Sequence, residues 1–552
     1  MDAAERAAAE REFLKDNEGL AAALAALGSP LLRPTIVIQD GLQPWIINAT
    51  ETILIEKSSK LQLFKRGVEM VRVVILTDED KRDDVLKRPT GTVQLMPVSM
   101  PYLKNTLNQL INFQKILKTG KAKDINCPDD LVQIYLSGAG EWRLSELTGF
   151  IEAPIMRRDG SILSTTGYDT STGLFLVDGQ WPVIPDSPTR EDALKALAVL
   201  SWPFSQFPFI DGANKSVLIA AILTAIQRRL LQFAPLFGFS APQPRSGKSL
   251  LAESIAIIAQ GRKSAAMAVA TDGNEFRKAI AAALHEGQAI VNLDNLEYPL
   301  GSPDLCRALT QEIYSDRQLG VTHNLLLPTN MLWTATGNNL TFKGDLSSRT
   351  LLCQIDAETA RPEERTFRID LTAYLLANRM QLLGAALTML KAYQKAGRSR
   401  QDVKPWGGFD DWSRTIRELL VWLGCDDPCE TREQIIVDDP DRELDVAVLS
   451  ALNDAFNDKK DGVLVSEIIN EAATNEVLKV QLLMVAAQRT DSKSIDPRRL
   501  GNWCRKVEGR FYDDLRLVRG KTQQRATMWR ITSKADKAPR VALVKKKRSF
   551  SR

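Results

Sequence analysis

Residues 236–253 read LFGFSAPQPRSGKSLLAE. The first five residues are apolar enough for a buried strand, and the apolar pattern from Leu250 onward is typical of a helix. Between these two predicted elements lies a loop that closes on Gly247, Lys248 and Ser249. A strand, a Gly-Lys-Ser loop and a helix form the setting of a phosphate-binding loop, because backbone N–H groups and the positive end of the helix dipole converge there. The stretch therefore predicts an α/β core that binds a nucleotide.

The side chains of this loop predict how ATP and Mg²⁺ would be held. We expect Lys248 to reach the β- and γ-phosphates and the Ser249 hydroxyl to ligate Mg²⁺. The loop departs from the usual pattern at Pro242, which replaces the first glycine, and at Arg245, where a glycine with positive φ is common. A purely structural turn is the alternative interpretation. The predicted nucleotide-binding residues are Arg245, Ser246, Gly247, Lys248, Ser249 and Leu250.

A second, mostly apolar stretch covers residues 288–294 and ends in Asp294. Its distance from Lys248 suits the end of a second parallel strand, and ligands bind at the carboxyl edge of such a sheet. We therefore expect Asp294 to be the second Mg²⁺ ligand, the alternative being an Asp that starts a turn. Asn295 follows, at a position where a water-activating Glu is common. Glu297 is the candidate catalytic base if the loop bends.

A third apolar stretch, residues 331–336, runs into Gly337 and Asn338. An amide at this position can orient the water that attacks the γ-phosphate, although Gly-Asn-Asn is also a good turn. Further along, Arg349 precedes another apolar stretch. An Arg there suits a finger that reaches the γ-phosphate of a neighbouring subunit. The alternative is an ordinary surface Arg.

This order of features resembles AAA+ ATPases, and more specifically the superfamily 3-type helicases of phages, plasmids and integrated mobile elements. The resemblance is carried by GFSAPQPRSGKSLL at residues 238–251, ATGNNL at residues 335–340 and GDLSSR at residues 344–349. It covers about residues 195–395. It implies a homo-hexameric ring that hydrolyses ATP with Mg²⁺ to move on single-stranded or forked DNA. Other replication proteins would be further partners.

The resemblance also implies a β-hairpin that points into the pore of the ring, between the Asp-ended and Asn-ended strands. In this chain the interval holds two short apolar stretches on either side of His323 and Asn324, which would form the tip. Arg317 and His323 are therefore predicted to contact the DNA backbone. A turn that faces solvent is the alternative.

Residues 494–533 predict a helix followed by a hairpin. Asp496-Pro497 is a favourable helix start, and apolar stretches from Leu515 and from Thr527 flank a basic turn. This arrangement resembles a winged helix, whose helix would enter a groove while the wing contacts phosphate. A winged helix that binds protein is the alternative. The predicted DNA-binding residues here are Arg498, Arg499, Arg505, Lys506, Lys521 and Arg525.

The chain has 552 residues, enough for three or four domains. We expect an N-terminal helix (1–30), an α+β region (31–188), an AAA+ phosphate-loop domain (189–396), a linker with a helix (397–440), a winged-helix-like domain (441–533) and a basic tail (534–552). Within the α+β region, residues 36–38, 52–55 and 71–76 are predicted strands. The predicted fold class is multidomain α/β, with a parallel sheet in the AAA+ domain.

The net charge of +4 is unevenly distributed, because residues 534–552 carry eight Lys or Arg and one Asp. This tail would add salt-sensitive DNA affinity or act as a solubilising end. Two histidines and a single C-x3-C pair argue against a His-rich metal centre and against zinc. The longest largely apolar run, residues 217–226, is shorter than the ~20 residues that cross a bilayer. With no secretory signal in view, we expect a cytoplasmic protein without a membrane segment.

Two functions remain open. The first is an ATP-driven DNA helicase or translocase for replication of a mobile element, with Lys248, Asp294, Glu297, Asn338 and Arg349 as catalytic residues. The second is a nucleotide-switched DNA-binding or assembly factor that hydrolyses ATP poorly, and Asn295 is its main support. The one dense acidic stretch, residues 78–84, lies in a polar region, so we assign no metal-dependent polymerase chemistry to the N-terminal region.

Overall fold

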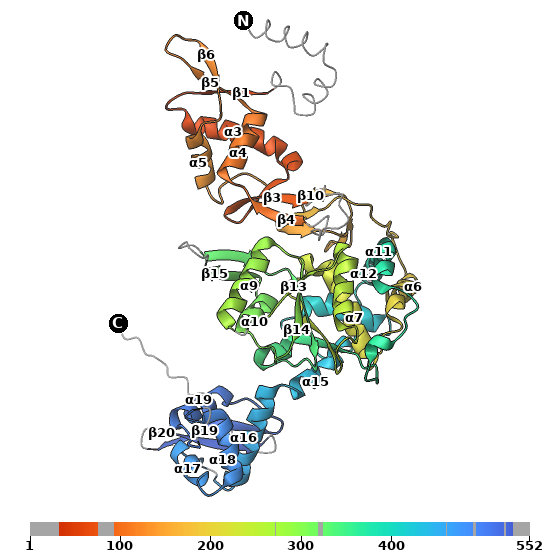
Figure 1. Cartoon of the computed structure of the whole chain (residues 1–552), viewed down its shortest axis with the longest axis vertical. Helices are drawn as coiled ribbons and strands as arrows, with labels where there is room; N and C mark the ends of the chain where they lie inside the picture. The colour runs from red at the N-terminus through yellow and green to blue at the C-terminus, as the bar shows by residue number, and fades with distance from the viewer. Residues whose placement is uncertain are drawn as a thin grey trace, which may run out of the picture. The chain divides into compact units, whose positions relative to one another are not determined.

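The computed structural model describes residues 33–75, 93–270, 272–317, 324–459, 461–489, 493–523 and 526–533. The predicted N-terminal helix (1–30), the acidic stretch (78–84) and the basic tail (534–552) lie outside the described residues. The chain divides into two compact units (Figure 1). The first unit comprises residues 1–296, 304–339 and 351–430, and the second comprises residues 297–303, 340–350 and 431–552.

A five-stranded sheet forms the centre of the first unit, with strand order β13-β14-β17-β12-β18. The strands are β13 (Ala265–Met267), β14 (Ile290–Leu296), β17 (Leu332–Asn338), β12 (Leu236–Ala241) and β18 (Thr350–Gln354). The pairings β13–β14, β14–β17 and β17–β12 are parallel. Parallel pairing turns the carboxyl ends of β12, β14 and β17 to one edge of the sheet. The predicted multidomain α/β fold with a parallel sheet is confirmed at this level.

Helices cover this sheet and bury its apolar strands. They are α6 (Arg190–Ser201), α7 (Gly212–Gln227), α8 (Lys248–Gln260), α9 (Gly273–Glu286), α10 (Pro303–Thr310), α11 (Leu371–Ala377) and α12 (Arg379–Lys395). The long apolar run of residues 217–226 lies inside α7, which is buried on nearly all sides and so is a core helix. Among the helices of the described ranges, none has both the length and the apolar character to cross a membrane.

Residues 406–422 also join the core of the first unit. They form α13 (Asp410–Trp412), a π-helical turn (Ser413–Arg417) and α14 (Glu418–Trp422). The Trp412 ring is fully buried against Phe237 of β12, with ring centroids 6.4 Å apart. Its Nε1 donates to Thr224 Oγ1 of α7 at 2.8 Å. This part of the predicted linker therefore packs as firmly as the helices around it.

In the described residues before the β-rich segment, 33–75 and 93–148, small sheets combine with three helices. The elements are β1 (Thr35–Ile38), α3 (Gln43–Leu61), β2 (Leu63–Arg66), β3 (Glu69–Ile75), β4 (Val93–Pro97), α4 (Met100–Leu110), β5 (Asn112–Ile116), β6 (Ala122–Ile125) and α5 (Asp129–Ser137). The predicted strand at residues 52–55 is wrong, because these residues lie within α3. Ile46, Thr50 and Leu54 are buried at helical spacing, so packing overrides the β-propensity of the isoleucines.

A small β-rich segment connects this part to the five-stranded sheet and its helices. Its strands are β7 (Gly149–Ile151), β8 (Ile155–Met156), β9 (Ile162–Leu163), β10 (Gly167–Asp169) and β11 (Leu174–Leu176). A hairpin extends from the core between α10 and β17. Its strands β15 (Ile313–Arg317) and β16 (Asn324–Pro328) pair antiparallel, from Ile313↔Pro328 to Arg317↔Asn324. The predicted hairpin is present, but Asn324, which we expected at its tip, pairs with Arg317 at the start of β16. Residues 318–323 lie outside the described residues.

The second unit contains a helical group followed by a hairpin. Its elements are α15 (Thr431–Val437), α16 (Pro440–Phe456), α17 (Val465–Glu471), α18 (Glu476–Ala486), α19 (Pro497–Val507), β19 (Leu515–Gln523) and β20 (Ala526–Ser533). The expected helix start is present, since Asp496 accepts from the N–H groups of Arg498 and Arg499. β19 and β20 pair antiparallel. The winged-helix assignment itself stays a prediction.

We expect one contact in the first unit to depend on pH. His285 Nε2, at the end of α9, lies 3.2 Å from Glu69 Oε2 of β3. The hydrogen bond to Glu69 raises the pKa of His285 and lowers the pKa of Glu69. A raised histidine pKa stabilises the fold below the unfolded value of about 6.5, and that contribution is lost as the pH rises through the folded pKa. The thermal midpoint should therefore fall as the pH rises above about 6.5, and less so in His285→Gln. An equal fall in both proteins would contradict this assignment.

Candidate nucleotide site

The backbone between β12 and α8 forms a tight loop at Gly247. Gly247 has φ of +100°, and a Cβ added there would lie 2.9 Å from the Phe207 ring. Only glycine meets both conditions without strain. Gly247 is also the N-cap of α8, and no side chain caps this helix. The N–H groups of its first turn are therefore open to an anion.

Arg245 adopts the backbone conformation that the sequence predicts to be strained. Its φ is +57°, in the left-handed region. Its guanidinium is mostly exposed and lies 4.0 Å from Glu363, a surface pair that contributes little to stability. Beside it, Ser246 Oγ donates to the Gln243 carbonyl at 2.6 Å. The loop is thus held by its own hydrogen bonds, while Arg245 remains free to turn toward a ligand.

Lys248 is the cation at the centre of the site. Its Nζ donates to Asn338 Oδ1 at 2.7 Å and to the Gln243 carbonyl at 3.0 Å. Both acceptors are neutral oxygens. Burial lowers the pKa of Lys248, which is the expected effect of removing an ammonium group from water. A partly buried cation held by neutral oxygens gains most from an anionic ligand.

Asp294, at the end of β14, lies beside the start of α8. Its Oδ1 accepts from Ser249 Oγ at 3.3 Å, from Thr336 Oγ1 at 2.6 Å and from Asn292 Nδ2 at 3.3 Å. The two predicted Mg²⁺ ligands are therefore within hydrogen-bonding distance of each other. Carboxylate and hydroxyl oxygens suit Mg²⁺, which usually keeps several waters and takes substrate phosphates as further ligands. In the described ranges no group of three or more His, Cys, Asp and Glu gathers as a metal site.

Three of these partners were missed from the sequence: Thr336, Asn292 and the Gln243 carbonyl. Asn292 and Asp294 are two residues apart on β14, and Thr334 and Thr336 are two apart on β17. Thr334 Oγ1 donates to Asn292 Oδ1 at 3.0 Å, one step below the Thr336–Asp294 bond. The sequence signal for these partners is a polar residue at every second position of both apolar stretches. This pattern identifies the hydrogen-bonded pairs only once β14 and β17 are known to be neighbours.

The predicted catalytic base lacks structural support. Asn295 has φ of +52°, and its N–H donates to Thr336 Oγ1 at 3.1 Å. The strand is therefore irregular directly after Asp294, between Leu293 and Leu296, and β14 continues to Leu296. Glu297 is exposed and belongs to the second unit. Arg349 also belongs to the second unit, where its Nη1 donates to the Asp345 carbonyl at 2.8 Å. The roles of Glu297 and Arg349 stay predictions.

The predicted DNA-binding residues are only partly described. His323, Arg525 and the side chain of Arg317 lie outside the described residues. In the second unit, several of the others make internal contacts: Arg499 with the Ala487 carbonyl, Arg505 with Gly501 and Asn502, Lys506 with Asp445, and Lys521 with Asp461. Arg498 is exposed. DNA binding through α19 and the hairpin stays a prediction.

The glycine requirement can be tested by Gly247→Ala. A Cβ at φ of +100° costs about 1–3 kcal/mol of backbone strain and also meets Phe207. We expect the affinity for Mg²⁺-ATP, measured by titration calorimetry, to fall at least about tenfold. Gly273→Ala is the matched control, because a Cβ there meets no atom within 4 Å. Equal nucleotide affinity in wild type and Gly247→Ala would contradict this geometry.

Comparisons with known proteins find solved structures that are similar to this chain, but they do not assign the chain to a family. No family model matches the chain, and no curated protein matches it. An apo structure of the NrS-1 C-terminal region is 13% identical and has a TM-score of 0.36, covering 89% of this chain and 99% of that one. The "SCCmec type IV Cch - active helicase" structure is 12% identical with a TM-score of 0.27, covering 75% and 82%. The JCV helicase is 15% identical with a TM-score of 0.22, covering 42% of this chain and 59% of that one. Likenesses at these identities and TM-scores assign neither a family nor a function.

Proposed function

We propose that this chain is an ATP-driven DNA helicase or translocase that works as a hexameric ring in the replication of a mobile element. The observation that carries the proposal is the meeting of Lys248, Ser249, Asp294 and Asn338 at one edge of the parallel sheet. A lysine, a hydroxyl, a carboxylate and an amide gathered beside an uncapped helix start suit binding of Mg²⁺-ATP and orientation of the attacking water.

The first step is binding of the triphosphate. The open N–H groups at the start of α8 would hold phosphate oxygens, and Lys248 would exchange its neutral partners for the anion. Ser249 and Asp294 would supply two oxygen ligands for Mg²⁺. The metal would neutralise charge that develops on the phosphate oxygens.

The second step is attack by water. When Lys248 turns to phosphate, Asn338 Oδ1 loses its hydrogen-bond donor. The freed amide would then orient the attacking water. Glu297 is the proposed base, and Arg349 is proposed to stabilise the γ-phosphate of a neighbouring subunit. Both roles rest on the sequence alone.

A second candidate is a nucleotide-switched DNA-binding or assembly factor that hydrolyses ATP poorly. Asn295 supports it, because an amide stands where a water-activating carboxylate is common, and its N–H is already bonded to Thr336. This candidate would bind ATP at the same site as the proposed helicase but would hydrolyse it slowly.

ATPase activity stimulated by single-stranded DNA separates the two candidates. Lys248→Ala should lower the turnover by about 100-fold, since it removes a charge that acts on the transferred phosphoryl group. Lys263→Ala is the matched control. Lys263 follows the other end of α8, is 57% exposed and pairs with Glu253. Its variant should keep wild-type activity. Absence of ATP turnover by pure wild-type oligomer on single strands would contradict the helicase proposal and leave the switch.

Mixing experiments test whether Arg349 acts on a neighbouring subunit. If it does, activity should fall more steeply than the fraction of wild-type chains as Arg349→Ala protein is added. Arg361→Ala is the control, because Arg361 is 72% exposed and pairs only locally with Glu364. A linear fall with Arg349→Ala would count against a shared site.

A further inference from the structure

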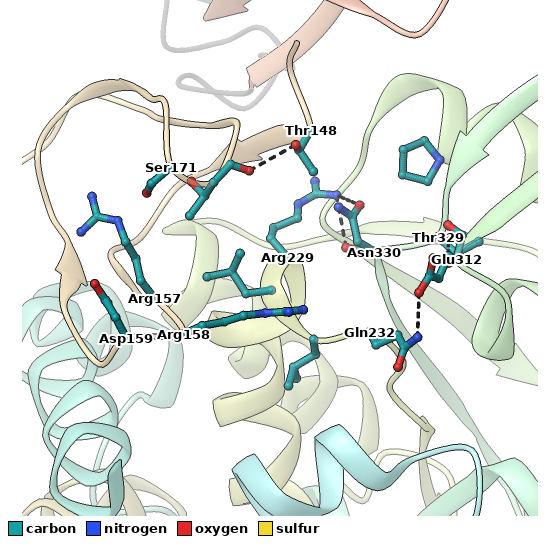
Figure 2. Close-up of a pocket in the computed structure, with 14 residues that line it drawn as sticks. Thr148, Arg157, Arg158, Asp159, Ser171, Arg229, Gln232, Glu312, Thr329 and Asn330 are labelled. Atoms are coloured by element: carbon teal, nitrogen blue, oxygen red, sulfur yellow. Dashed lines mark hydrogen bonds between the residues drawn. The ribbon is translucent and has the colours of Figure 1, made fainter. Parts of the chain in front are cut away.

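A cavity of about 770 Å³ lies in the first unit, walled by three segments that are far apart in the sequence (Figure 2). One wall is made by turns of the small β-rich segment, at residues 157–159 and 171–172. A second is the chain that leaves α7, at residues 229–232. The third is the base of the β15–β16 hairpin, at Glu312 and residues 328–330. We call this cavity the root pocket. None of its lining residues belongs to the nucleotide site.

Arg229 brings a buried positive charge to the wall of the root pocket. Its side chain is 9% exposed. Nη1 donates to Asn330 Oδ1 at 2.7 Å and Nη2 to the Gly287 carbonyl at 2.7 Å, while Nε has no hydrogen-bond partner. Burial lowers the pKa of Arg229 to about 10, which is the effect of desolvating a guanidinium group. These acceptors are neutral, and Glu152, the carboxylate that attracts Arg229 electrostatically, is already paired with Arg262.

Arg158 supplies a second positive charge. It is exposed and makes no hydrogen bond or ion pair with another described residue. Figure 2 shows its side chain extended across the pocket, below Arg229. A free guanidinium with five N–H donors suits a phosphate group, which accepts in the same forked geometry.

The other charged groups of the pocket are already engaged. Arg157 pairs with Asp169 at 2.8 Å. Asp159 accepts from the Ser161 hydroxyl at 2.7 Å, and Glu312 accepts from Gln232 Nε2 at 2.6 Å. The donors to Asp159 and Glu312 are neutral, but both carboxylates are exposed and screened by water. Arg229 is the buried charge of the pocket, and it favours an anion.

Its place in the fold indicates which anion. The pocket lies at the base of the hairpin whose tip is predicted to contact DNA, and the five residues of each strand span about 17 Å. Its volume lies within the range of small-ligand sites, so it can admit a phosphate with its sugar. We propose that the root pocket binds a backbone phosphate of a single DNA strand through Arg158 and Arg229, with Asn330 as a further donor. This inference rests on the proposed DNA function.

The test measures binding of a fluorescent oligothymidylate to the full chain by anisotropy. Arg158→Ala should weaken binding about fivefold and reduce the salt dependence by about one released counterion. Arg158→Glu should weaken it further, and Arg158→Lys should stay near wild type. Arg400→Ala, at a residue 71% exposed outside the pocket, is the control. Because Arg158 is exposed, all variants should unfold at the wild-type temperature.

Two results would overturn the inference. One is wild-type DNA affinity in both Arg158→Ala and Arg158→Glu. The other comes from a competition experiment with thymidine monophosphate or inorganic phosphate at concentrations far below that of the DNA strand. Displacement of the oligothymidylate from wild type and Arg400→Ala, but not from Arg158→Ala, would mark the root pocket as a small-ligand site. Failure of the proposed function looks different: wild type would then bind Mg²⁺-ATP, dependent on Lys248, and bind no oligothymidylate at all.

Discussion

The site depends on one interaction, the hold of Asn338 and the Gln243 carbonyl on the ammonium group of Lys248. These bonds, at 2.7 and 3.0 Å, tie the loop after β12 to the end of β17. A partly buried ammonium needs acceptors, because an unsatisfied buried cation is costly. The two neutral oxygens take two of its three N–H donors and leave its charge to a ligand. The loop is therefore fixed in place before a nucleotide binds, which lowers the ordering cost of binding.

The position of β17 makes this arrangement possible. It lies between the loop strand β12 and the carboxylate strand β14, so its end faces both. Asn338 bonds to the loop on one side, and Thr336 bonds to Asp294 and to the N–H of Asn295 on the other. A single strand thus sets the distance between the phosphate loop and the carboxylate. The hydroxyl and amide groups at the end of β17 orient Asp294 and Lys248, because apolar contacts alone do not orient polar groups.

The features that could be predicted from the sequence are those that short, local stretches of residues encode. The strained Arg245, the apolar strands β12, β14 and β17 and their polar ends are encoded within short stretches of sequence, and they lie where we expected. The Thr336–Asp294 bond was not predictable, because it depends on which strands pair. The strand expected at residues 52–55 is part of α3, since the burial of Ile46, Thr50 and Leu54 outweighed local β-propensity. Glu297, three residues after Asp294, belongs to the other unit. The short distance between the two residues in the sequence does not reveal this boundary. The root pocket needs three distant segments, so no window of sequence contains it.

We infer that neutral oxygens hold Lys248 until a phosphate of the nucleotide binds to it. A structure with Mg²⁺ and a non-hydrolysable ATP analogue tests it most directly. We expect Lys248 Nζ to leave Asn338 Oδ1 for a phosphate oxygen, the phosphates to lie against the first turn of α8, and Mg²⁺ to contact Ser249 and Asp294. A nucleotide bound elsewhere, with the Lys248–Asn338 bond intact, would contradict it.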